Sequence, residues 1–470
     1  MKKSGFAIHV PHKFITSQLF RAASLTELFR RVDFSVSTRR VCGFNVFFFL
    51  LPLVVFSQNS TKPVYCVTAC PAQEVEHEMN ISWAADSAHT ETYVLVTKSS
   101  DKKWRKAKIF QPEQHEFCTV FDGKSSKSAS NDNFLENARF WKNGAHLTGL
   151  EADTDYKYII RTGKKGRRGT NLSSEHHFKT SGAEEWSCCI ISDFHSYPPL
   201  SGRLSSAMKM IDTVRNYDPE MDWILHIGDI TAWGASYSFW QIMYEEQPFA
   251  DFFWAGVNGN HDNMSRYNEN SNQYFRQTAY YPHNGYADEM GVCYHFRYGD
   301  VMFVMLNNEA MRQEAGLNEA QQWVKQVVSN ARMSKNPPRF VVVAEHYQWF
   351  FGQDGRNAQY SRWNTLFDEL KVDLAIGANN HIYARTGAIF NDEKTDGSFG
   401  TVYLQTSSAD NERGQEMQEL QYNEDKIESR FTEGKRTVSA INMKVTRNQI
   451  RLVLLDRNGQ QMDDYVIPAK

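Results

Sequence analysis

The chain has 470 residues, of which 41% are hydrophobic and 13% aromatic. This length and composition can supply two ordinary domains with buried cores, and they exclude a chain that is disordered throughout. The formal net charge of −3 gives no electrostatic basis for binding phosphate backbones, so we expect no nucleic-acid partner.

Residues 1–57 are typical of a targeting segment. An apolar run, Val46–Phe56, follows two arginines and has the length of a signal-peptide core, which is short for a membrane span. We expect cleavage before Gln58, export to the periplasm or the extracellular space, and no stable membrane span in the mature chain. An uncleaved anchor and a start site assigned too far upstream are the alternatives.

Six cysteines follow the targeting segment. In an oxidising compartment Cys66, Cys70 and Cys118 can supply a disulfide, whose pairing the sequence does not fix. Cys188 and Cys189 open an apolar strand, where free cysteine packs as a small hydrophobe. The chain has no CxxC pattern, so we expect no cysteine zinc site.

Residues 61–182 consist of short alternating segments separated by polar stretches, which predicts an all-β sandwich. The predicted strands include Met79–Trp83, Thr92–Val96, Tyr156–Ile160 and His176–Thr180. Trp83 and the stretch from Leu147 to Tyr158 resemble a fibronectin type III domain. That resemblance implies a structural role for Tyr156, whose hydroxyl bonds back to the upstream backbone.

Residues 183–470 alternate apolar strands with segments of helical period, which predicts an α/β layered domain. The predicted helices are Leu204–Asn216, Ser236–Glu246, Asn318–Asn330 and Ser361–Leu370. Three later apolar segments, 401–405, 437–445 and 450–455, are expected to complete a sheet as antiparallel strands.

Metal-ligand residue types follow five of the apolar runs in this second region. They are Asp193 and His195, then Asp229, then Asn260 with His261 and Asp262, then His346, and finally His381. A single Asp or His at a strand end is more often a cap or a core residue. The ordered set is different, because carboxylate, amide and imidazole ligands without thiolates suit Mn, Fe, Zn or Co in a two-metal hydrolytic site.

The motifs resemble those of the calcineurin-like metallophosphoesterase family. The resemblance lies in Asp193-Phe194-His195, Gly228-Asp229, Gly259-Asn260-His261-Asp262, Glu345-His346 and His381. A fibronectin-like domain in front is similar to the arrangement of purple acid phosphatases. The resemblance implies a four-layer αββα core with two divalent metal ions where the strand ends meet.

The same resemblance implies a role for each residue. One metal is expected on Asp193, His195, Asp229 and His381, and the other on Asp229, Asn260 and His346, with Asn379 at a further position. His261 is expected to donate a proton to the leaving oxygen, with Asp262 orienting it.

Two positions depart from the family pattern. Ala232 stands where purple acid phosphatases place the tyrosine that gives them their colour, so we expect a colourless protein. His195 stands where the wider metallophosphoesterase family has a histidine, which favours a pair of divalent metal ions. Asn379 stands where the family has a second-metal histidine, and an amide oxygen is a weaker donor than imidazole to these metals. We therefore expect a weakly held second metal.

The expected function is an exported metal-dependent phosphoesterase, in which a metal-bridging hydroxide attacks a small phosphorylated substrate. Phosphomonoesters are the expected substrates. The alternatives are a phosphodiesterase or nucleotidase, and a secreted binding protein whose metal site has decayed, which Asn379 favours.

Several aromatic residues beyond the ligand loops form either a substrate rim or core packing: Tyr197, Trp233, Tyr347, Trp349, Phe350 and Phe351. Arg385 contacts either phosphate or a surface carboxylate.

Overall fold

The computed structural model describes residues 63–87, 91–119, 136–163, 169–196, 202–245, 250–263, 272–350, 358–410, 424–431 and 438–470. The expected targeting segment with its cleavage site before Gln58, and the aromatic residues Tyr197 and Phe351, lie outside these ranges. Within the ranges, no helix combines the length and the hydropathy that a membrane crossing requires.

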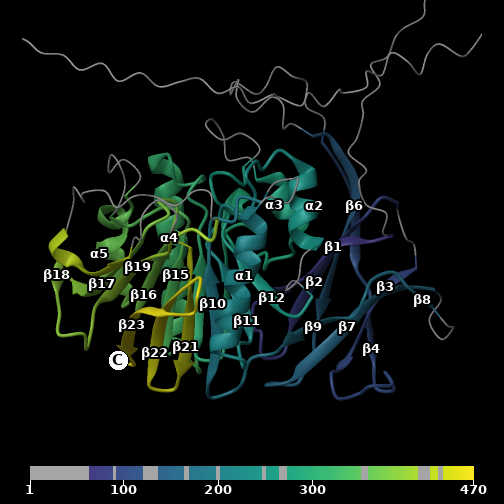
Figure 1. The fold of residues 1–470 in the computed structure, drawn as a ribbon, viewed down its shortest axis with the longest axis horizontal. Coiled ribbons are helices and arrows are strands. Elements are labelled where there is room, and N and C mark those ends of the chain that lie inside the picture. The colour runs from purple at the N-terminus through teal and green to yellow at the C-terminus, as the bar shows by residue number, and fades with distance from the viewer. Residues whose placement is uncertain are drawn as a thin grey trace, which may run out of the picture. The chain divides into compact units, whose positions relative to one another are not determined.

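The largest sheet runs through both sequence regions (Figure 1). In spatial order its strands are β23 (Gln461–Pro468), β22 (Gln449–Asp456), β21 (Ser439–Thr446), β10 (Trp186–Ile191), β11 (Trp223–His226), β12 (Phe253–Gly256), β1 (Tyr65–Pro71), β2 (Met79–Ala85), β6 (Ala138–Leu147) and β5 (Glu113–Thr119). β10, β11 and β12 are parallel, and β1 joins them where Ala69 pairs with Phe253. The sheet is therefore continuous across residue 182, and a domain boundary at that position stays a prediction.

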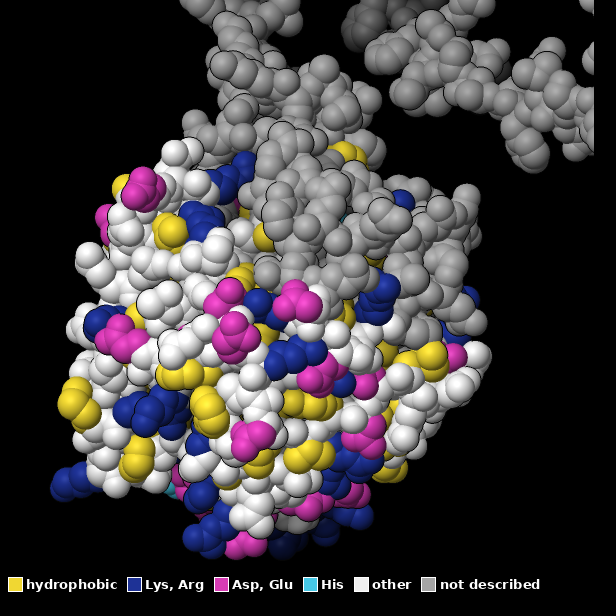
Figure 2. Space-filling view, turned by 90° about the vertical axis from the view of Figure 1, so that its left-hand side faces the viewer, with side chains coloured by type: hydrophobic (Ala, Val, Ile, Leu, Met, Phe, Trp, Pro, Cys, Tyr) yellow, Lys and Arg dark blue, Asp and Glu magenta, His cyan; other side chains and the backbone are white. Residues whose placement is uncertain are grey.

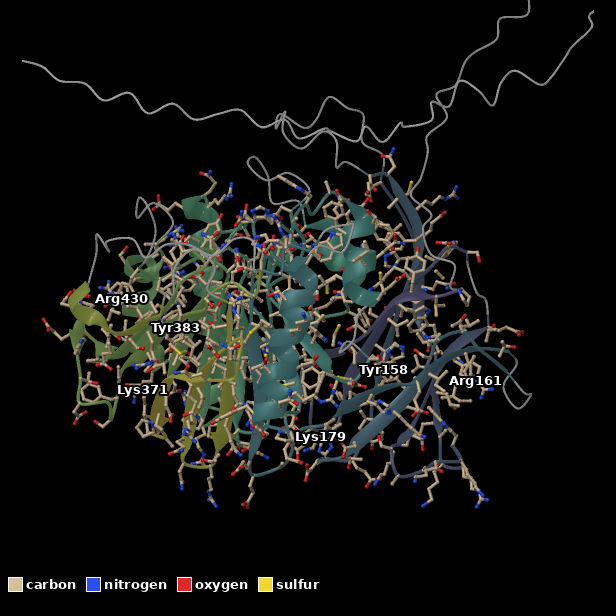
Figure 3. The ribbon with its side chains drawn as sticks, viewed as in Figure 1. Tyr158, Arg161, Lys179, Lys371, Tyr383 and Arg430 are labelled. Atoms are coloured by element: carbon tan, nitrogen blue, oxygen red, sulfur yellow. The ribbon has the colours of Figure 1, made fainter. Side chains whose placement is uncertain are left out.

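A second sheet completes the N-terminal sandwich. It contains β4 (Lys108–Phe110), β3 (Thr92–Lys98), β7 (Asp155–Thr162), β8 (Thr170–Asn171) and, paired with β7, β9 (His176–Lys179). The Tyr156 hydroxyl accepts a hydrogen bond from the backbone N–H of Glu151 at 2.9 Å, which confirms its expected structural role. Lys179, labelled in Figure 3, ties this sandwich to the second region through Asp222, 2.8 Å from its ammonium group.

The third sheet faces the parallel strands of the first. Its order is β13 (Tyr294–Tyr298), β14 (Val301–Met305), β15 (Phe340–Ala344), β16 (Leu374–Gly377), β19 (Thr401–Gln405), β17 (Tyr383–Phe390) and β18 (Glu393–Lys394), with β20 (Ile427–Phe431) paired to β17. Side chains of β15 alternate between two cores: Val342 packs in the core shared with the first sheet, and Val341 and Val343 pack in the core under the helices. This period of two is what a strand covered on both faces requires.

Helices cover the outer faces of the two facing sheets. α1 (Gly202–Tyr217) contacts β10, β21 and β22, whereas α4 (Glu314–Arg332) and α5 (Tyr360–Leu370) pack over the third sheet. The expected αββα layering is thus confirmed, as are the four predicted helices, the remaining one being α2 (Tyr237–Glu245). The short α3 (Gln273–Thr278) and the 3₁₀ turns η3 (Ala287–Glu289) and η4 (Glu424–Lys426) lacked a periodic signal.

The expected disulfide is not formed, since Cys66, Cys70 and Cys118 are all free. Cys66 and Cys70 lie on β1, where four residues of strand separate their Cα atoms by about 13 Å. Cys118 lies on β5, and β2 and β6 stand between it and β1. Disulfides need Cα atoms within about 7 Å, so the geometry excludes these pairs.

On the face shown in Figure 2, hydrophobic side chains are interspersed with lysine, arginine, aspartate and glutamate. Isolated hydrophobic side chains are normal on the surface of a folded protein. The described residues on this face therefore form no broad apolar patch.

Candidate metal centre

The predicted ligand loops meet because of the sheet topology. Asp193 and His195 follow β10, and Asp229 follows β11. His346 follows β15 and His381 follows β16, in the sheet that faces them. Parallel strands end at the same edge of a sheet, and ligands of α/β proteins bind at that edge. The packing of the two sheets therefore brings the loops together.

Three overlapping groups of buried side chains place their ligand atoms within 4.8 Å of one another. They are Asp193 with His195 and His381, His195 with Asp229 and His261, and Asp193 with Asp229 and His346. Asp229 Oδ2 lies 3.2 Å from His195 Nε2 and 3.3 Å from His346 Nε2. His381 Nε2 lies 3.2 Å from Asp193 Oδ1. Asp229 thus occupies the central position that a carboxylate bridging two cations needs.

The donor set fits a pair of divalent cations. The side-chain oxygen of Asn260 is buried and has no hydrogen-bond partner, which costs about 1–3 kcal/mol when nothing coordinates it. Asp193 and Asp229 are buried carboxylates surrounded by imidazoles, the mixed oxygen and nitrogen set that Mn, Fe, Zn and Co accept.

The ligand loops have a strained backbone. Asp193, His195, Asp229 and His381 all adopt left-handed φ angles, of 55°, 45°, 53° and 60°. An L side chain in this region costs roughly 1–2 kcal/mol, and such residues concentrate at functional sites. The left-handed backbone at these residues directs several ligand side chains toward one point.

Two histidine rings are oriented by backbone carbonyls. His346 Nδ1 donates to the carbonyl of Ile227 at 2.7 Å, and His261 Nδ1 donates to the carbonyl of Ala232 at 2.8 Å. Their Nε2 atoms therefore face Asp229 Oδ2, at 3.3 Å and 4.0 Å. This arrangement leaves Nε2 of His346 available to a cation and Nε2 of His261 available to a proton.

The Asp262 carboxylate joins two of the ligand loops. Its carboxylate accepts hydrogen bonds from the backbone N–H groups of Thr231 and Gly259, both at 2.9 Å. The carbonyl of Ala232 provides the hydrogen bond that orients His261. Asp262 thus fastens the loop after β12 to the loop after β11, and its role in orienting His261 stays a prediction.

The buried carboxylates and imidazoles of the centre shift one another's pKa values. Burial alone raises the pKa of Asp193 and Asp229, but the histidines around them hold both values below the ordinary range. Burial lowers the pKa of His346, yet the Asp229 carboxylate outweighs that effect and raises the pKa to about 10. A cation entering the site must displace this proton, since metal ligands bind in their deprotonated form.

Asn379 lies in the same loop as His381, with a left-handed φ of 69°. Its side-chain amide donates to the side-chain oxygen of Gln348 at 2.7 Å. Its role as a metal ligand stays a prediction.

Most of the described aromatic candidates belong to the interior. Trp349 and Phe350 pack against Tyr403 in the core under the helices, so they do not form a rim. The Tyr347 hydroxyl donates to Glu309 at 2.5 Å in a buried contact. Trp233 is half-buried with its ring centroid 5.9 Å from that of His261, which keeps it as a rim candidate.

Arg385 has a structural role. Its guanidinium pairs with Asp463 at 2.7 Å and with Glu428 at 3.3 Å, and the side chain is buried. Asp463 also accepts a hydrogen bond from Tyr383, labelled in Figure 3, at 2.6 Å. The expected pairing of Arg385 with a carboxylate is therefore confirmed, although the arginine itself is buried, and the pair with Asp463 joins β17 to β23.

Sequence reasoning missed two supporting residues. Asp410 Oδ2 lies 3.4 Å from His195 Nδ1. Because Asp410 follows β19, the search for polar residues after apolar strands could have found it. The side-chain oxygen of Asn308 accepts the backbone N–H groups of His346 and Tyr347, both at 2.8 Å, at the end of β14. Neither residue belongs to a motif that the sequence displays.

Comparisons with known proteins agree with this geometry. Residues 188–383 match the family model described as calcineurin-like phosphoesterase, and residues 65–180 match the one described as purple acid phosphatase, N-terminal domain. Residues 188–383 thus form a calcineurin-like phosphoesterase domain, and a purple acid phosphatase N-terminal domain lies in front of it.

Individual relatives are distant. An uncharacterized protein of Mycobacterium tuberculosis, found in two strains, is 23% identical over 308 residues, which are 56% of this chain and 56% of that protein. The chain thus spans about half the length of the curated relatives it matches.

Solved structures show the shared fold. The purple acid phosphatase from yellow lupin (Lupinus luteus) seeds aligns with a TM-score of 0.66 at 14% identity, covering 87% of this chain and 74% of the lupin chain. The structure of PhoD aligns with a TM-score of 0.52 at 12% identity, covering 87% and 94%.

Proposed function

We propose that the protein is an exported, metal-dependent phosphoesterase that hydrolyses small phosphate esters, with monoesters preferred. The observation that carries the proposal is the convergence of buried imidazoles on Asp229, with two Nε2 atoms at 3.2 Å and 3.3 Å from one carboxylate oxygen. The match of residues 188–383 to the calcineurin-like phosphoesterase model supports the hydrolase class, while export and the preference for monoesters belong to the proposal.

The chain offers ligands for two divalent cations drawn from Mn, Fe, Zn and Co. Asp193, His195, Asp229 and His381 would hold one, and Asp229, Asn260 and His346, with Asn379, the other. When bound, such ions polarise phosphoryl oxygens and lower the pKa of coordinated water. Asn379 makes the second site the weaker one, because its amide is a poorer donor than imidazole.

His261 is the general acid in this proposal. Its Nδ1–H donates to the Ala232 carbonyl, so the transferable proton sits on Nε2, 4.0 Å from Asp229 Oδ2. The ring of His261 is only 4% exposed, so it faces the centre rather than bulk water. Proton transfer by a positioned side chain contributes about 10²–10⁴-fold to rate.

The test compares aryl phosphates that differ in leaving group. His261→Ala should slow hydrolysis of phenyl phosphate by at least about 100-fold and of p-nitrophenyl phosphate by less, because p-nitrophenolate leaves with little need of a proton. His115→Ala is the matched control, since His115 is an exposed residue on β5 and should leave both rates unchanged. Equal losses on the two substrates would count against the acid role.

The competing functions give different outcomes. Turnover of bis-p-nitrophenyl phosphate without turnover of the monoester would assign the protein to the phosphodiesterases. If the wild type is inactive with Mn, Fe, Zn and Co alike, the enzyme function is refuted and a secreted binding protein is the remaining function. Export is checked by N-terminal sequencing of the mature chain, which should start at Gln58, and a chain that retains residues 1–57 would contradict it.

A further inference from the structure

A buried carboxylate lies on the opposite side of the His195 ring from Asp229. Asp410 Oδ2 is 3.4 Å from His195 Nδ1, while His195 Nε2 is 3.2 Å from Asp229 Oδ2. Asp410 and His195 are both fully buried. Each ring nitrogen of His195 therefore faces a carboxylate oxygen: Nε2 forms a hydrogen bond with Asp229, and Nδ1 lies beside Asp410 without hydrogen-bond geometry.

The segment that carries Asp410 is fastened to the ligand loop after β10. The backbone N–H of Ala409 donates to the carbonyl of Ser192 at 3.0 Å, and the Ser408 hydroxyl donates to the carbonyl of Asp193 at 3.0 Å. The Ser408 hydroxyl also accepts the backbone N–H of Asp410 at 2.9 Å. Because this segment follows β19 in the facing sheet, the bonds fix the position of Asp410 relative to His195 across the two sheets.

A cation compensates the buried charge of Asp410. Arg203, in the first turn of α1, places its Nε 3.4 Å from Asp410 Oδ2. A buried carboxylate is costly without such a partner. Arg203 therefore balances the charge of the Asp410 carboxylate where it lies beside His195.

We propose that Asp410 is a positioning residue of the metal centre. By attracting the proton of His195 to Nδ1, it fixes the tautomer in which the Nε2 lone pair points at the cation, and it strengthens that nitrogen as a donor. The inference rests on the proposed metal-dependent function and adds to it a residue behind the ligand shell.

The first test measures metal affinity. Zn²⁺ is titrated calorimetrically into the metal-free full chain, and Asp410→Asn should weaken the site that includes His195 by about 10–100-fold. Asp463→Asn is the matched control, because it removes another arginine-paired carboxylate, 2.7 Å from Arg385 and remote from the ligand loops in sequence. The control should lower the thermal midpoint and leave Zn²⁺ affinity unchanged.

The second test needs no variant at the positioning residue. In the Zn²⁺-loaded wild type with ¹⁵N-labelled histidine, the His195 signals, identified by their loss in His195→Gln, should show a protonated Nδ1 and a metal-bound Nε2. Metal on Nδ1, or a proton on neither nitrogen, would overturn the inference even if Asp410→Asn does not fold.

The outcomes separate the two claims. A wild type that binds Zn²⁺ and hydrolyses phosphate esters, beside an Asp410→Asn variant with the same Zn²⁺ affinity, would overturn this inference alone. A wild type that takes up no metal would overturn the proposed function and this inference with it.

Discussion

Replacing Gly228 with alanine should disable the second metal site while leaving the fold intact. Gly228 precedes Asp229 and has a left-handed φ of 84°. A Cβ at this position would overlap Nδ1 of His346 and lie 2.7 Å from Cγ of the same ring. Carbon atoms in contact lie about 3.5–4.0 Å apart, so the His346 ring has to move by about 1 Å.

The expected magnitude follows from that displacement. Metal sites tolerate deviations of about 0.2 Å in ligand distance, so a shift of about 1 Å removes His346 from the second cation. Misplacement on this scale lowers kcat by about 100-fold. The left-handed backbone adds about 1–2 kcal/mol of destabilisation, because an L side chain is disfavoured there.

The assay is metal content after dialysis, with turnover of p-nitrophenyl phosphate and thermal unfolding of the metal-free chain. Gly397→Ala is the matched control: Gly397 has a φ of 90°, and an added Cβ would meet nothing within 4 Å. It shares the backbone cost but should keep both metals. A Gly228→Ala variant with wild-type metal content and turnover would refute the assignment of His346 to the second metal.

Three further outcomes are expected. Asn379→His should tighten the second metal by about tenfold or more in a Zn²⁺ titration, since imidazole is the better donor, and unchanged affinity would count against that assignment. Metal affinity should rise with pH up to about 10, because Asp229 raises the pKa of His346 to about 10 and the cation must displace that proton; equal affinities at pH 6 and pH 8 would contradict this. Burial lowers the pKa of Lys142 to about 7, so the folded state loses about 4 kcal/mol of stability as pH falls from 10.5 to 7, because over that range the unfolded chain binds the proton more readily. Lys142→Met should therefore raise the free energy of unfolding at pH 7 more than at pH 10, and a gain that does not depend on pH would refute the coupling.

Much of the fold could be predicted from periodicity. The predicted helix at 361–370 has Trp363 and Phe367 one turn apart, and both lie on the buried face of α5. The parallel strands appeared as continuous apolar runs because both of their faces are covered, as on β15. The continuity of the first sheet could not be predicted, since the pairing of Ala69 with Phe253 joins strands far apart in sequence.

The ligand loops were predictable and their supports were not. Asp193, Asp229 and His381 lie within short motifs at strand ends, where type and order carry the signal. The hydrogen bond from the backbone N–H of Thr231 to the Asp262 carboxylate could not be predicted, because it joins two loops that are apart in sequence. Asp410 follows a strand as the other candidate residues do, but its contact with His195 depends on the packing of two sheets.

The central claim is that phosphate ester hydrolysis depends on metal held at Asp229. The most direct measurement adds Mn, Fe, Zn or Co stepwise to the metal-free chain and follows p-nitrophenyl phosphate turnover together with bound metal. Turnover should appear with at least one of these metals as the second equivalent binds, and Asp229→Asn should abolish both binding and turnover. A wild type that stays inactive with all four metals, or an Asp229→Asn variant that keeps wild-type turnover, would contradict the account.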